Sequence, residues 1–144
     1  MKKALSCFIL FVLLSCSEAI QESDLQNLTG IWEIEKVKLS DETEKEYKIN
    51  EAVEQIQFEN KNGIRRKVRL VYNGNFLLNN IIQKFTIEEK DNSFYILNHT
   101  EFSDWKEEIK LLTNESLMLE NEQGMKYYYK KRTDIKIGKD GKEI

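Results

Sequence analysis

The feature that most constrains the fold is the alternation of apolar and polar residues along most of the chain after Gly30. A period of two places the apolar side chains of a strand on one face, whereas apolar residues on a helix recur at three and four. Turn-forming residues bound the alternating segments, and Asn73-Gly74-Asn75 is the strongest hairpin signal among them. Eight segments are predicted to be strands: 30–39, 53–59, 67–72, 81–88, 93–99, 105–112, 116–120 and 125–132.

Strands of this length joined by short turns indicate an antiparallel meander. A flat eight-stranded sheet would leave two unpaired edges, and closing the sheet into a barrel removes them. The predicted fold is therefore all-β, an eight-stranded antiparallel up-and-down barrel with a short N-terminal helical turn, for which Ser23 is the candidate N-cap. Residues 42–55 leave room for a short helix, a longer loop or an extra strand at 47–49.

The start of the chain has the composition of a bacterial export signal. Lys2 and Lys3 precede an apolar run at 4–14, which is shorter than the roughly 20 residues that a membrane-spanning helix needs. The run ends in Leu13-Leu14-Ser15-Cys16, which resembles the lipobox of bacterial lipoproteins. The resemblance implies cleavage before Cys16 and attachment of lipid, palmitate included, to that cysteine. The alternative is an ordinary secretory signal peptide in which Cys16 is incidental.

Cleavage at Cys16 divides the chain into four parts. The last part is a C-terminal tail, in which Ile135 and Ile137 are predicted to pair as a short strand. The end of this tail is predicted to be disordered. The parts are a signal peptide at 1–15, a lipidated tether at 16–27, a β-barrel at 28–132 and the tail at 133–144.

Cysteine content and charge exclude several classes of site and partner. Cleavage leaves Cys16 as the one cysteine, so neither a disulfide nor a free thiol is expected. Loss of Lys2 and Lys3 moves the net charge from −3 to −5, and an acidic, membrane-anchored chain is a poor partner for nucleic acid. Ser17 rather than Asp follows Cys16, which by the same resemblance implies the outer membrane, at its periplasmic face or at the cell surface.

The first predicted strand opens with Gly30-Ile31-Trp32, a G-x-W sequence after a short helical turn. A second motif, L-T-x-x-x-L-x-L, lies at 112–119, and a tyrosine-rich strand closes the barrel at 127–132. Together these features resemble the lipocalins, and in particular the small lipocalin-like lipoproteins of Gram-negative bacteria. The resemblance implies that Trp32 plugs the barrel floor and that Gly30 allows a close approach there. It also implies a basic residue of the last strand over Trp32: Arg132 by position, with Lys131 as substitute.

The apolar face of the first strand changes parity along its length. Trp32 and Ile34 share one face, whereas Val37 and Leu39 have the opposite parity. A strand that switches face in this way is predicted to contain a bulge near Glu35.

Aromatic residues are spread over most of the predicted strands. In an eight-stranded barrel alternate residues face inward, and the interior holds either side chains alone or one small ligand. The aromatic residues therefore either line a ligand cup or fill it. The candidates for lining a cup are Tyr72, Phe85, Phe94, Trp105, Tyr127 and Tyr129.

Catalytic chemistry is not indicated. His99 is the single histidine, and no nucleophile elbow, paired base, metal-ligand spacing or phosphate-binding loop accompanies it. We therefore expect a monomeric, non-enzymatic protein without cofactor or metal, anchored to the membrane by lipid.

Two functions remain at this point. The first is binding of a small apolar or amphipathic ligand; the second is a scaffold or interaction module of the envelope with a filled barrel. An apolar interior cavity above about 300 Å³, open away from Trp32, would favour the first. A filled interior with an exposed apolar patch would favour the second.

Overall fold

The computed structural model of the protein describes residues 18–71, 76–78 and 81–138. Cys16 and Tyr72, and the predicted hairpin turn at 73–75, lie outside these residues. No helix of the described part is long and apolar enough to cross a bilayer.

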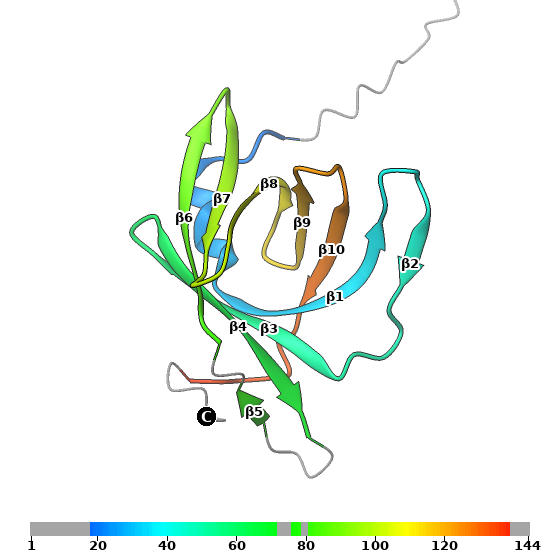
Figure 1. Ribbon diagram of the computed structural model, residues 1–144. Coiled ribbons are helices and arrows are strands. Elements are labelled where there is room, and N and C mark those ends of the chain that lie inside the picture. The colour runs from blue at the N-terminus through cyan, green and yellow to red at the C-terminus, as the bar shows by residue number, and fades with distance from the viewer. Residues whose placement is uncertain (1–17, 72–75, 79–80, 139–144) are drawn as a thin grey trace, which may run out of the picture.

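The described chain forms one 3-10 helix followed by strands that close into a barrel (Figure 1). Successive long strands pair antiparallel, and β10 pairs with β1 to complete the ring. This confirms the predicted eight-stranded antiparallel up-and-down barrel. The elements are η1 Glu22–Leu28, β1 Gly30–Lys38, β2 Glu44–Glu46, β3 Ala52–Glu59, β4 Asn62–Leu70, β5 Phe76–Leu78, β6 Gln83–Lys90, β7 Ser93–His99, β8 Asp104–Leu112, β9 Ser116–Asn121 and β10 Lys126–Lys131.

Two short strands lie outside the eight-stranded ring. β2 pairs with the end of β1, so the extra strand predicted at 47–49 lies at Glu44–Glu46 instead. β5 pairs with the end of β4. Ser23 does not cap the helical turn, because η1 begins before it. The N-cap is Gln21, and its backbone N–H donates to the Asp24 carboxylate over 2.8 Å.

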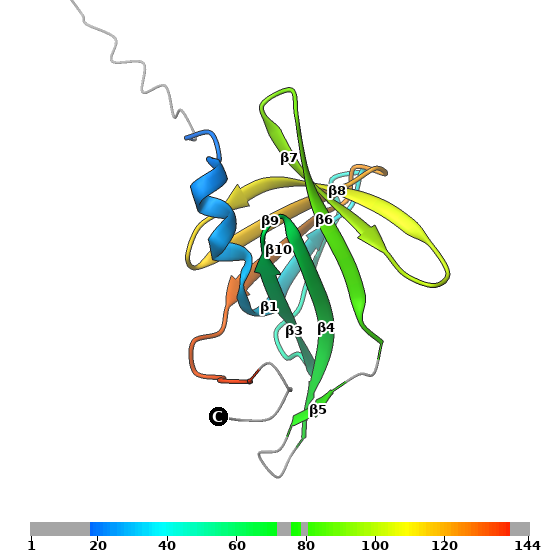
Figure 2. The same cartoon turned by 90° about the vertical axis from the view of Figure 1, so that its left-hand side faces the viewer.

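One end of the barrel is closed by η1. Leu25 and Leu28 of this helix are almost completely buried in the same apolar cluster as Trp32. Figure 2 shows η1 beside β8 and β9, at the end where β1 begins and β10 finishes. The opposite end, where β6 and β10 begin, is called the mouth below.

The bulge predicted in β1 is confirmed. Ile34 pairs with Tyr129, but the next pair joins Lys36 to Tyr128, so Glu35 is the extra residue. The bulge brings Val37 onto the inner face, where it is 6% exposed. Both apolar halves of this strand therefore point into the barrel despite their opposite parity.

β4 begins earlier than its alternation predicts. Asn60 and Lys61 adopt left-handed φ values of 51° and 63°, so two residues suffice for the turn from β3. The next residues, 62 and 63, therefore belong to the strand. β4 consequently runs from 62 to 70 rather than from 67 to 72.

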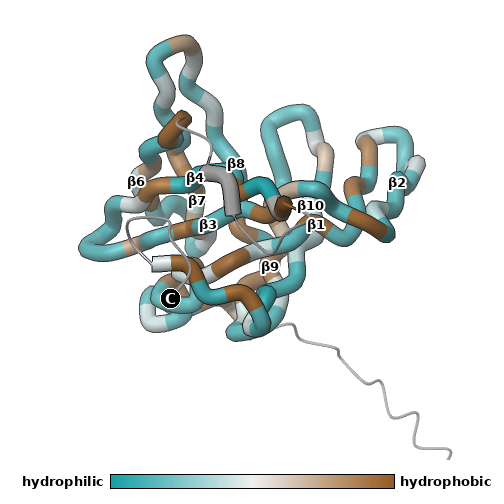
Figure 3. The backbone as a smooth tube through the Cα atoms, turned by 90° about the horizontal axis from the view of Figure 1, so that it is seen from below, coloured by the Kyte–Doolittle hydropathy of each residue, from teal (hydrophilic) through white to brown (hydrophobic). Residues whose placement is uncertain are grey.

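The barrel wall has two apolar faces. The inner face contains most of the core, and Figure 3 shows apolar positions alternating with polar ones along the strands. A second cluster joins Ile31, Val53 and Val68 to Ile135 of the C-terminal segment, with Ile137 packed against it. Ile31 and Val53 have the opposite parity to Trp32 and Ile56 of the same two strands. Because Trp32 and Ile56 belong to the inner core, the second cluster lies on the outer wall.

Candidate ligand-binding surfaces

The barrel floor is built around Trp32, which is 1% exposed. Its indole Nε1 donates to the Leu28 carbonyl over 2.8 Å, which ties strand β1 to η1. The Lys131 ammonium lies 4.7 Å from the centroid of the indole ring and donates to the carbonyls of Asn27 and Thr29. Burial lowers the pKa of Lys131. Gly30 has φ 153°, and a Cβ there would lie 3.0 Å from the Lys131 side chain.

The cation over the indole is therefore Lys131, and the assignment of Arg132 to the floor is corrected. Trp32 pairs directly with Lys131, so both side chains point inward, whereas the next residue points outward. On the outer wall Arg132 binds Glu33 over 3.1 Å and Asp134 over 2.6 Å. This contact lowers the pKa of Asp134 to about 2.

The interior is occupied by side chains. Phe85, Phe94 and Tyr129, three of the candidate cup-lining residues, are at most 6% exposed and belong to the core. Tyr127 is half-buried against this core, and Trp105 is half-exposed near the mouth. The aromatic residues of the described part thus mainly fill the barrel rather than line a hollow.

Above the apolar core the barrel contains a buried ion-pair network. Arg65 of β4 donates to Glu54 of β3 over 2.7 Å and to Glu107 of β8 over 2.7 Å, the latter contact crossing the interior. Asn98 donates to the same Glu107 oxygen over 2.8 Å and accepts from Gln83 over 3.2 Å. The network therefore joins five strands of the barrel wall across its interior.

Burial and charge act in opposite directions on this network. Burial disfavours the charged form of Arg65, but the adjacent Glu54 and Glu107 outweigh it and raise its pKa further above the ordinary value. Burial also raises the pKa of the Tyr129 hydroxyl, and the nearby carboxylate of Glu54 adds to the effect. We conclude that Arg65 is permanently charged and that two carboxylates compensate it.

The hollow that remains at the mouth is small and charged. It measures about 160 Å³, and its lining includes Glu54, Arg65, Lys67 and Gln83. Ligand pockets for small molecules usually occupy about 300–1,000 Å³ and are mostly apolar. This hollow does not meet the criterion set for an interior ligand cup. Among the described residues, no group of three or more His, Cys, Asp or Glu side chains has the arrangement of a metal site.

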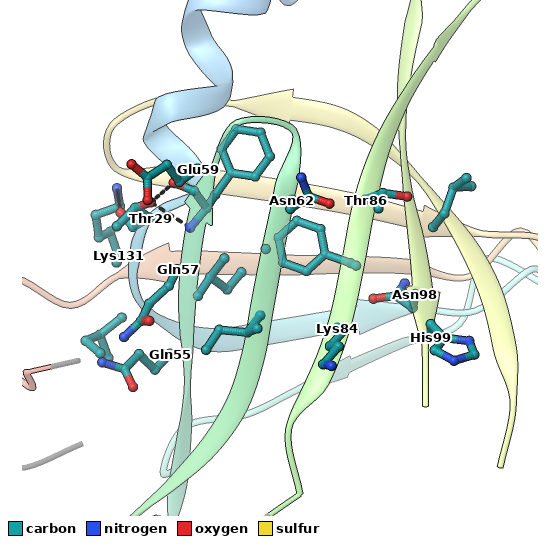
Figure 4. Close-up of a pocket in the computed structure, with 18 of the residues that line it drawn as sticks. Thr29, Gln55, Gln57, Glu59, Asn62, Lys84, Thr86, Asn98, His99 and Lys131 are labelled. Atoms are coloured by element: carbon teal, nitrogen blue, oxygen red, sulfur yellow. Dashed lines mark hydrogen bonds between the residues drawn. The ribbon is translucent and has the colours of Figure 1, made fainter. Parts of the chain in front are cut away.

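A much larger groove lies on the outer wall, with a volume of about 1540 Å³. It runs over the outer face of β3, β4, β6 and β7, and Figure 4 shows its labelled residues spread across these strands, from Gln57 on β3 to His99 on β7. The C-terminal segment with Ile135 and Ile137 borders it on one side, and the start of β8 borders it on the other. We call this feature the wall groove.

The wall groove combines apolar surface with a cationic rim. Ile64 of β4 and Leu97 of β7, both half-buried, contribute apolar side chains to its lining. The described lining contains the cations Lys84, Lys106, Lys131, Arg132 and Lys136 and the carboxylates Glu59, Asp104 and Glu122. This local excess of positive charge contrasts with a whole chain of net charge −3.

Sequence reasoning did not find the wall groove. Of the candidate ligand-lining residues, Phe85 and Trp105 border it. The groove depends on the curvature of the sheet and on the C-terminal segment folding back over β3, where Gln55 donates to the carbonyls of Ile137 and Gly138. Neither feature has a local sequence signal.

No family model matches the chain, and no curated protein matches it. Among solved structures, it is similar to a lipocalin-like protein from Bacteroides uniformis, with 17% identity over 74% of this chain and 99% of that one and a TM-score of 0.48. A protein from Bacteroides eggerthii is similar with 13% identity over 73% and 99% of the two chains and a TM-score of 0.48. Apocrustacyanin C1 matches with 12% identity over 78% and 64% and a TM-score of 0.46. The barrel assignment itself rests on the strand order and on the pairing of β10 with β1.

Proposed function

We propose that the protein is a lipid-anchored, non-catalytic binding protein of the bacterial outer membrane. In this proposal its lipocalin-like barrel is a rigid scaffold, and the wall groove holds a small apolar or amphipathic molecule. The observation that carries the proposal is the groove volume of about 1540 Å³ beside an interior hollow of about 160 Å³. Binding energy for such a ligand comes chiefly from removing apolar surface from water.

The groove can be tested by filling it. Thr86 is exposed on β6 and lines the wall groove, so Thr86→Trp adds a large side chain there without entering the core. Native mass spectrometry of protein purified from its host should show a copurifying small molecule with the unsubstituted chain and none with Thr86→Trp. Leu111→Trp is the matched control, because Leu111 is 40% exposed on β8, outside the groove. Retention of the molecule by Thr86→Trp would contradict this location.

The lipid anchor is tested separately. Cys16 lies outside the described residues, and its lipidation is proposed from the resemblance of 13–16 to a lipobox. Cys16→Ser should move the protein from the membrane pellet to the soluble fraction, because a single polar tether has no membrane affinity of its own. Continued pelleting of the variant would contradict the anchor and leave the groove proposal untouched.

A second candidate is an envelope interaction module, and the filled interior favours it. Phe102, in the turn between β7 and β8, is 91% exposed, and Ile49 between β2 and β3 is 90% exposed. In this second function, a protein partner would bury these two side chains. Absence of any copurifying small molecule, together with unchanged behaviour of Thr86→Trp, would favour this second function.

A further inference from the structure

We infer that the wall groove binds an anionic amphiphile, an apolar chain that ends in a carboxylate or a phosphate. The inference rests on the proposed function, because it names the class of ligand for the same groove. It starts from Lys84 and Lys106, two cations that line the groove and form no ion pair with the described carboxylates. The same lysines would repel an amphiphile with a cationic end.

Two of the rim cations are already engaged. Lys131 donates to two backbone carbonyls and covers the Trp32 ring, and Arg132 is paired with Glu33 and Asp134. Neither of these side chains offers a free charge to a ligand without losing a contact on which the barrel floor or the outer wall depends.

Lys84 and Lys106 are better placed. Lys84 is exposed on β6, and Lys106 of β8 lies over the Tyr95 ring at 4.3 Å. The described carboxylates form no ion pair with either ammonium group. The nearest lining carboxylate on the same strand as Lys106 is Asp104, and it is paired with the His99 imidazole.

The strand register places the two lysines on either side of β7. Lys84 pairs with His99, and Lys106 pairs with Leu97, so two strand spacings and an offset of two residues along β7 separate them, roughly 12 Å. Two lysine side chains can reach an acid group between them over this distance. The geometry therefore places the anionic end over β7.

The groove offers the apolar chain of the ligand Ile64 and Ile137, with Gln57 between them. Ile64 lies beside Lys84 in the register, and Gln57 of β3 lies beside Ile64. Beyond β3 the C-terminal segment presents Ile137 at the far side of the groove. A chain that runs from Lys84 across Ile64 toward Ile137 would contact apolar surface along the groove.

The test compares ligands that share a chain and differ in charge. The full chain carrying Cys16→Ser avoids detergent, and Trp105, which lines the groove, provides a fluorescence signal. Dodecanoate and dodecyl phosphate should each bind at least about tenfold more tightly than dodecanol, and dodecyltrimethylammonium should bind most weakly. Tighter binding of dodecanoate than of dodecyl phosphate would indicate a carboxylate ligand, and the reverse would indicate a phosphate.

The charge inference and the proposed function fail in different ways. Equal affinity for dodecanol and dodecanoate would overturn the anionic class and leave the groove as a binding site. Absence of binding by all four compounds would overturn the groove function itself.

Matched lysine variants test the position of the acid group. Lys84→Gln and Lys106→Gln should each weaken dodecanoate binding about fivefold, the loss expected for one partly exposed charge pair, and leave dodecanol unchanged. Lys90→Gln is the control, because Lys90 lies at the other end of β6, is exposed, and does not line the groove. An equal loss with Lys90→Gln would overturn the assignment, because it would indicate the general field of the protein rather than the rim.

Discussion

Gly63 shows how a single residue sets the packing of two neighbouring strands. It pairs with Phe58 on one side and with Phe85 on the other. The two phenyl rings stack above it with centroids 6.1 Å apart and planes within 3°. A Cβ at position 63 would lie 2.0 Å from the Phe85 ring, so the absence of a side chain is what allows the stack.

Gly63→Ala should therefore destabilise the barrel by about 1–3 kcal/mol, the usual cost of overpacking a core. Phe85→Leu in the same chain should recover part of the loss, because it removes the ring that the new methyl group meets. Urea unfolding of the single and double variants measures this coupling. Strictly additive losses would contradict the proposed clash.

Trp32 is the largest fully buried side chain among the described residues. Trp32→Ala should lower the free energy of unfolding by about 3–5 kcal/mol, because a buried indole and its hydrogen bond to Leu28 are lost together. Trp105→Ala, at the half-exposed second tryptophan, is the control and should cost clearly less. Chemical denaturation followed by circular dichroism checks both, and a near-neutral Trp32→Ala would show that the floor is misassigned.

At the scale of elements, alternation predicted the existence of each long strand but not always its inner face. In β4 the apolar residue Val68 has outward parity, and it is buried in the outer cluster that includes Ile135. The inward positions include Arg65 and Lys67. A charged residue in an alternating strand normally indicates the solvent side, so the sequence predicted the reverse orientation for this strand.

The same reasoning explains why the ion-pair network could not be predicted. Arg65, Glu54 and Glu107 lie far apart in the sequence, and each resembles a solvated strand residue by itself. They meet because closure of the sheet brings β3, β4 and β8 around one interior. By contrast, the G-x-W start, the bulge and the eight strands have local signals, and for these the prediction succeeded.

Arg65→Met should destabilise the protein by about 3–5 kcal/mol, because it leaves two carboxylates in the interior without their cation. Adding Glu54→Gln and Glu107→Gln to the same chain should restore much of the loss. Arg69→Met is the matched control on β4, since its side chain is 66% exposed and its pair with Glu51 spans 3.8 Å. Thermal unfolding distinguishes these variants; a small loss for Arg65→Met would mean that water reaches the network.

At the scale of the whole molecule, the C-terminal segment belongs to the folded structure up to residue 138. Ile135 is 8% exposed against Ile31, Val53 and Val68, and residues 135–137 also border the wall groove. The segment therefore links the stability of the outer wall to the shape of the proposed binding site.

Ile135→Ala should cost about 2–3 kcal/mol and also weaken dodecanoate binding, because the wall of the groove loses its support. Ile49→Ala, at a residue that is 90% exposed, should change neither property. Unfolding and fluorescence titration of the same two variants provide the comparison. Unchanged ligand affinity in Ile135→Ala would separate the segment from the groove.

The β3–β4 hairpin is the place where the ring would come apart first. Within the hairpin, residues 52–59 pair continuously with 62–69. Its flanks are attached more sparingly, since β1 joins it through residues 30–32 and β6 through residues 83–86. In rare openings of the native state, this hairpin should therefore separate from β1 and β6 as one unit, because its pairing with each of them is short. Each opening would expose the Arg65 and Glu107 side chains to solvent, although they are only 7% and 8% exposed in the closed barrel.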